Sequence, residues 1–161
     1  EGKAGFQIMG DWAKGEFTAA GKVPGVDYYC AATPSNNGYL YNVDSFIFYK
    51  TSDPDKQAGQ KLLAKLMMGK NFQKVFNLYK GSIPARLDVP MDEFDKCAKT
   101  SNSDIKTAGA SGGLVPSFAH GMAQGNTMKA ALQDVITEHF NSDMSSVDAA
   151  NALADSVLDN M

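Results

Sequence analysis

The feature that most constrains the fold of this 161-residue chain is the imbalance between its helical and its strand patterns. Three stretches are rich in apolar, aromatic and β-branched residues in the manner of strands: 4–9, 26–33 and 39–49. The rest reads as six or seven helices and their connections. Three strands are few for so many helices, so we expect sheets that are completed by residues outside this chain. The chain also opens directly on the first stretch without an initiator Met, which favours a missing upstream part.

Start and stop signals define the first two long helices. Ser52-Asp53-Pro54 supplies a capping side chain and a proline in the first turn, and Gly69 closes the helix. A second helix carries an apolar stripe and ends at Lys80-Gly81. A turn or two is expected around Phe94 and Cys97, and the Gly-rich stretch 108–116 is predicted as a loop.

Two further helices close the chain. The longer one is amphipathic and carries His139 on its apolar face, where we interpret the imidazole as a packing residue. The last begins at Ser145 with Asp148 three residues on, a variant of the capping box.

Composition excludes several classes of function. The net charge of −3 offers no basic surface for nucleic acid or anionic lipid. No apolar stretch approaches the roughly 18 to 20 residues of a membrane span. The His and Cys residues are scattered at Cys30, Cys97, His120 and His139, without the spacing of a zinc site. No metal and no cofactor are predicted.

The sequence also lacks a pattern for covalent catalysis. There is no G-x-S-x-G elbow, and neither Ser82 nor Ser117 has a visible base partner. Paired acids such as Asp11 with Glu16 are interpreted as helix-start and surface charges. We therefore predict no catalytic residues and a protein that is not an enzyme.

Four polar or aromatic residues at the ends of predicted elements are candidates for binding. Trp12 is the single tryptophan and follows a strand pattern directly, where either core packing or function would suit it. Asp44 interrupts the apolar stretch 41–49, where a carboxylate is costly unless it is hydrogen-bonded or faces a cleft. Lys80 and His120 stand at helix–loop junctions beside glycines, and the residues alone leave their roles open.

The segments that contain these residues resemble one family. They read FQIMGDWAKGEF (6–17), YNVDSFIFYK (41–50), FNLYKGSIPARLDV (76–89) and PSFAHGMA (116–123). Together they resemble the glucose-binding type of periplasmic sugar receptor and, more broadly, the solute-binding proteins of bacterial ABC importers that include the maltose receptor. The resemblance covers essentially the whole chain, and its MGDW and KGSIP stretches are the most specific.

The resemblance implies an α/β fold of two lobes around a cleft, of which this chain is the C-terminal part. Residues 1–43 and 89–161 would belong to the C-terminal lobe, and 44–88 to the N-terminal lobe with its hinge crossings. The cysteine count alone leaves a disulfide open. This placement puts Cys30 and Cys97 in the same lobe, so the resemblance favours a bridge between them.

The resemblance also implies a function and partners. Trp12 would stack on a monosaccharide, glucose or a similar aldohexose; Asp44 would accept from its hydroxyls, and Lys80 and His120 would donate to or orient others. The partners would be the membrane permease of an ABC importer and the missing N-terminal half, in the periplasm. A sensor module for a signalling receptor is an alternative, and a carbohydrate-active enzyme is disfavoured because Asp44 lacks a second carboxylate.

Overall fold

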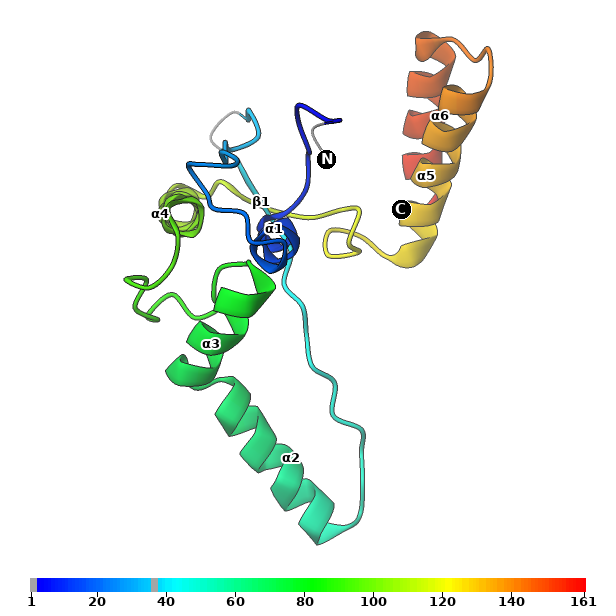
Figure 1. The fold of residues 1–161 in the computed structure, drawn as a ribbon. Coiled ribbons are helices and arrows are strands. Elements are labelled where there is room, and N and C mark those ends of the chain that lie inside the picture. The colour runs from blue at the N-terminus through cyan, green and yellow to red at the C-terminus, as the bar shows by residue number, and fades with distance from the viewer. Residues whose placement is uncertain (1–2, 36–37) are drawn as a thin grey trace. The chain divides into compact units, whose positions relative to one another are not determined.

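The computed structural model describes residues 3–35 and 38–161, and this part of the chain is rich in helix (Figure 1). The turn residues of 34–38 predict a loop between the stretches 26–33 and 39–49, and residues 36 and 37 of it lie outside the described residues. Along the described chain the elements are η1 (Asp11–Ala13), α1 (Lys14–Ala19), β1 (Tyr39–Tyr41), α2 (Pro54–Met67), α3 (Lys70–Lys80), α4 (Lys96–Ser111), β2 (Leu114–Pro116), α5 (Asn126–Asn141) and α6 (Ser146–Asp159).

The chain divides into two compact units. Unit 1 comprises Glu1–Tyr39 and Val43–Gly113, and unit 2 comprises Leu40–Asn42 and Leu114–Met161. The core of unit 1 is a small apolar cluster in which Val89, Phe94 and Ala98 are buried. The second half of α3 and the segment that follows it pack against this cluster, so the core fixes the end of α3.

Helix α2 begins at the predicted cap and α3 ends at the predicted glycine, whereas Gly69, which was predicted to close α2, is the N-cap of α3. The Asp53 carboxylate accepts hydrogen bonds from the N–H groups of Asp55 and Lys56, and Pro54 occupies the first turn of α2, where no N–H is needed. Gly81 closes α3 with a φ of 89°, a left-handed conformation that glycine adopts without steric cost.

The prediction for the stretch after residue 94 was wrong in extent. Instead of a turn or two, α4 runs for 16 residues, and it continues to Ser111 inside the predicted loop 108–116. Its buried residues are Ala98, Asn102 and Ala108, so the helix lacks the large apolar stripe by which such a helix is found in a sequence.

Two of the predicted strands are absent from the described structure, and the third is short. Residues 4–9 and 26–33 form no strand apart from an isolated bridge between Pro24 and Tyr28. The stretch 39–49 is a strand only over Tyr39–Tyr41. Apolar and β-branched residues favour a strand only where a neighbour completes its ladder. Within the described residues, β2 supplies that neighbour for β1 alone.

Unit 2 consists of a short parallel strand pair and a helical hairpin. The Ser117 N–H donates to the Tyr41 carbonyl at the end of the strand pair. Helices α5 and α6 pack side by side (Figure 1). The predicted cap of α6 is confirmed, because the Ser145 hydroxyl accepts from the Asp148 N–H at 3.1 Å. His139 is half-buried, and its Nδ1 lies 2.9 Å from the carbonyl oxygen of Met144.

Candidate functional site

The two most specific segments of the resemblance meet in unit 1. The start of α1 packs against the end of α3, so closely that backbone touches backbone. A Cβ on Gly15 would lie 2.6 Å from the Lys80 carbonyl oxygen, and one on Gly81 would lie 2.4 Å from the Gly15 nitrogen. Only glycine leaves room for this approach. We call this contact the Gly15–Gly81 junction.

Asp11 joins the same two segments by a hydrogen bond. Its Oδ2 accepts from the Ile83 N–H at 2.9 Å, 72 positions further along the chain. Burial raises the pKa of Asp11, while the bond from Ile83 and the charges of Lys14 and Lys80 act in the opposite direction. Asp11 lies in the first turn of η1, so its interpretation as a helix-start charge is confirmed. Its interpretation as a surface charge was wrong, because the residue is half-buried and accepts a hydrogen bond from a segment 72 positions away.

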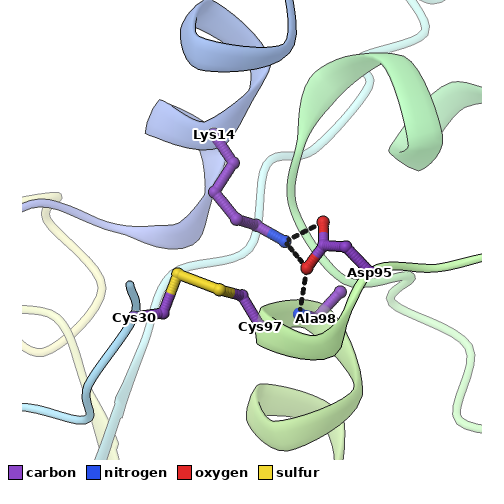
Figure 2. Close-up of a disulfide and its surroundings, with 5 residues drawn as sticks. All are labelled: Lys14, Cys30, Asp95, Cys97 and Ala98. Carbon is purple, nitrogen blue, oxygen red and sulfur yellow. Dashed lines mark hydrogen bonds and ion pairs between the residues drawn. A yellow bond between two sulfur atoms is a disulfide. The ribbon is translucent and has the colours of Figure 1, made fainter. Parts of the chain in front are cut away.

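An ion pair joins α1 to the start of α4, and a disulfide lies next to it (Figure 2). The Lys14 side chain is only 6% exposed, and its Nζ lies 3.0 Å from Oδ2 of Asp95. Asp95 also caps α4 by accepting from the Ala98 N–H at 2.8 Å. Two residues on, Cys97 forms a disulfide with Cys30, with their Cα atoms 5.7 Å apart. The pairing that the resemblance favoured is thus present in the structure.

Trp12 lies in η1, next to Asp11, and is half-buried. Its indole folds back over the backbone of Gly10: a Cβ on Gly10 would lie 2.1 Å from Cζ3 of the ring. The glycine before the Asp-Trp pair therefore makes space for the ring. Because η1 leads straight into α1, the Gly15–Gly81 junction holds the Trp12 backbone close to the end of α3.

Lys80 and Asp44 form an ion pair. Lys80 is the last residue of α3, where the helix dipole favours a cation. Its Nζ also lies 5.8 Å from the centroid of the Phe76 ring, within cation–π range. The Asp44 side chain is 64% exposed and follows β1 in a stretch without regular structure. The sequence predicted a strand around Asp44, but in the structure this carboxylate lies outside β1 and is stabilised by solvent and by Lys80.

His120 belongs to unit 2, in the turn that follows β2. Its side chain is exposed, and its Nδ1 lies 2.6 Å from the Ser117 hydroxyl. The expectation that Ser117 has no base partner was therefore wrong. Ser82, by contrast, donates to the amide oxygen of Asn77 at 2.8 Å.

The structure thus brings Asp44 and Lys80 into contact and sets the turn that bears Trp12 against the same end of α3. That His120 joins them in one site stays a prediction. Within residues 3–35 and 38–161, no three His, Cys, Asp or Glu side chains gather as ligands for a metal ion. The described helices include none that is both long and apolar enough to cross a bilayer.

A helix-rich chain with a small parallel sheet is consistent with part of an α/β solute-binding protein. No family model matches the sequence. The chain is similar to a "probable sugar-binding periplasmic protein" of Brucella suis, with 46% identity over 158 residues, 98% of this chain and 37% of that relative. The protein of the same name from Rhizobium meliloti is 44% identical over 158 residues, 98% of this chain and 38% of its own length.

An archaeal relative extends the comparison. An uncharacterized ABC transporter extracellular-binding protein of Pyrococcus horikoshii is 36% identical over 139 residues, which are 86% of this chain and 30% of that protein. The chain therefore spans less than two fifths of the length of each of these relatives. All three are named as binding proteins, and the two bacterial names support a periplasmic location for this chain.

Proposed function

We propose that this chain is part of a periplasmic binding protein that holds a monosaccharide, glucose or a similar aldohexose, and delivers it to a membrane ABC importer. The observation that carries the proposal is the similarity of 98% of the chain to a relative named as a sugar-binding periplasmic protein. The geometry of unit 1 supports it, because the backbone of Trp12 and the ion pair of Lys80 with Asp44 both lie close to the Gly15–Gly81 junction.

In this proposal the site recognises the two chemically different parts of a sugar. The C–H face of a pyranose would stack on the Trp12 indole, which the Gly10 backbone supports from behind. The sugar hydroxyls would donate to Asp44 and accept from Lys80. A carboxylate has about four lone-pair sites, so a bond from Lys80 leaves capacity for hydroxyl donors. His120 would donate to a further hydroxyl.

The proposal also includes the two lobes. Residues 1–43 and 89–161 would lie in one lobe and 44–88 in the other, and the remainder of the full-length protein would complete both. Unit 1 exposes large apolar side chains for which such a partner would account: Ile47 is 77% exposed, Tyr49 81% and Tyr79 82%. Sugar binding would then stabilise the closed arrangement of the lobes, and the permease would recognise this closed form. A sensor role at a signalling receptor would use the same binding residues.

The test is calorimetry on the full-length protein with glucose, galactose, mannose and maltose. We expect binding of a monosaccharide, weakened at least about tenfold by Asp44→Ala, because a hydrogen bond to a charged group contributes about 1.5–3 kcal/mol. Asp88→Ala is the matched control: Asp88 is also an exposed carboxylate of unit 1 in ion pairs, with Lys70 and Arg86.

The two variants separate the function from the assignment of residues. If the full-length protein binds none of the four sugars, the proposed function is wrong for this class of ligand. If Asp44→Ala binds as tightly as the parent and as Asp88→Ala, sugar binding stands and the role of Asp44 does not.

A further inference from the structure

A single turn after β2 presents His120 in a fixed position. The Gly121 N–H donates to the Phe118 carbonyl at 2.9 Å, and the Met122 N–H donates to the Ser117 carbonyl at 3.0 Å. This pair of bonds, with Gly121 at a φ of 71°, is the Schellman arrangement that ends a helical turn. His120 is the residue before that glycine, so its backbone is held by bonds on both sides.

Ser117 anchors the turn and contacts the imidazole. Its N–H donates to the Tyr41 carbonyl, which ties the residue to the end of the strand pair. Its side chain is buried, since the residue is only 3% exposed. The Ser117 Oγ lies 2.6 Å from Nδ1 of His120, and this is the one hydrogen bond of the Ser117 side chain within the described residues.

Burial decides which atom of this pair carries the proton. If Nδ1 were protonated, it would donate to Oγ, and the Ser117 hydroxyl proton would be left in a buried place without an acceptor. A buried donor without a partner is costly, and nearly all such groups in folded proteins are hydrogen-bonded. If the hydroxyl donates to Nδ1, both groups are satisfied. Nδ1 must then be unprotonated, and the imidazole proton lies on Nε2.

We propose that Ser117 is a positioning residue that holds His120 as the tautomer protonated at Nε2. The proposal rests on the proposed function in one respect: it makes His120 a hydrogen-bond donor toward the sugar. An Nε2–H group can bind a hydroxyl or ring oxygen through its lone pair, and it cannot accept a hydroxyl proton. At this position the ligand must therefore present an acceptor oxygen, whereas Asp44 requires a donor hydroxyl.

The second histidine of the chain provides an internal comparison. Nδ1 of His139 lies 2.9 Å from the carbonyl oxygen of Met144, and a carbonyl can only accept. His139 must therefore be protonated at Nδ1. The structure thus assigns opposite tautomers to the only two histidines in the sequence.

Nitrogen-15 NMR of this ligand-free chain, at a pH where both imidazoles are neutral, measures the two tautomers directly. We expect long-range proton–nitrogen spectra to show His120 with a protonated Nε2 and a bare Nδ1, and His139 with the reverse. In Ser117→Ala the His120 nitrogen shifts should move away from those of the form protonated only at Nε2, while those of His139 stay in place. Ser111→Ala, which removes a hydroxyl that bonds carbonyls of its own helix α4, should move neither.

A binding measurement on the full-length protein completes the test. Without the Ser117 hydroxyl, Nδ1 of His120 loses the donor that keeps it unprotonated, so Ser117→Ala should weaken sugar binding about 3- to 10-fold, the effect of one neutral hydrogen bond. A His120 spectrum with Nδ1 protonated overturns the proposal whether or not the protein binds a sugar. Unchanged His120 shifts and unchanged affinity in Ser117→Ala overturn the positioning role. If the full-length parent binds no sugar, the proposed function is wrong, and the NMR spectra still decide which tautomer His120 adopts.

Discussion

The Gly15–Gly81 junction predicts a specific pattern of costs when alanine replaces glycine. Gly81→Ala meets two penalties. Alanine in the left-handed conformation costs about 1–2 kcal/mol. The new Cβ, 2.4 Å from the Gly15 nitrogen, forces backbone apart at a further cost of about 1–3 kcal/mol. We expect Gly81→Ala to lower the free energy of unfolding by about 2–5 kcal/mol in all.

Two other glycines of unit 1 separate these penalties. Gly112 ends α4 with a φ of 73° and has no atom within 4 Å of an added Cβ, so Gly112→Ala should cost only the conformational part, about 1–2 kcal/mol. Gly59 lies in α2 with the same open space, so Gly59→Ala should stabilise the helix by about 0.5–1 kcal/mol. Gly15→Ala should gain a similar free energy from the higher helix propensity of alanine. Because the new Cβ clashes with the Lys80 carbonyl oxygen, we expect the net effect to be a destabilisation of up to about 2 kcal/mol.

Urea unfolding of this chain measures the four variants. Trp12, the single tryptophan, lies next to the junction, so its fluorescence reports the loss of this contact, and circular dichroism reports the helices. The reasoning is refuted if Gly81→Ala costs no more than Gly112→Ala and Gly15→Ala stabilises as Gly59→Ala does. In that case the backbones of α1 and α3 do not approach each other as described.

Two further predictions concern the disulfide and the buried acid. Cys30→Ser with Cys97→Ser opens a bridge between residues 67 positions apart, so it should lower the free energy of unfolding by about 4 kcal/mol in denaturant titration, and a change below about 1 kcal/mol would contradict this. Burial raises the pKa of Asp11, so its protonation stabilises the fold below the unfolded pKa of about 3.9, and this contribution is lost as the pH rises through the folded pKa. Asp11→Asn stays neutral and keeps an oxygen for Ile83, so its stability relative to the parent should rise between pH 3 and pH 7. Asp88→Asn should show the opposite trend, because the bonds from Arg86 and Lys70 lower the pKa of Asp88, and an equal trend in both variants would refute the assignment.

The sequence predicted those elements whose signals are local. The cap at Asp53, the glycine at Gly81 and the N-cap at Ser145 each involve residues within a few positions of one another, so their chemistry can be predicted without the fold. The full length of helix α4 was not predicted, because this helix buries alanines and an asparagine instead of a stripe of large apolar residues. The aromatic residues of 26–33 predict a strand, whereas in the structure Tyr28 stacks on Phe17 with ring centroids 4.7 Å apart.

The candidate binding residues could be named from the sequence only through a family resemblance, and the residues that hold them could not be named at all. Asp11, Lys14 and Ser117 act on partners that are distant in sequence or hidden by burial, so composition and periodicity leave them indistinguishable from surface residues. A sugar site depends on these as much as on its contacting groups, because a hydrogen bond to a hydroxyl is directional and a displaced donor loses most of its value. The supporting residues around Trp12, Lys80 and His120 are therefore where substitutions should change affinity without touching the ligand.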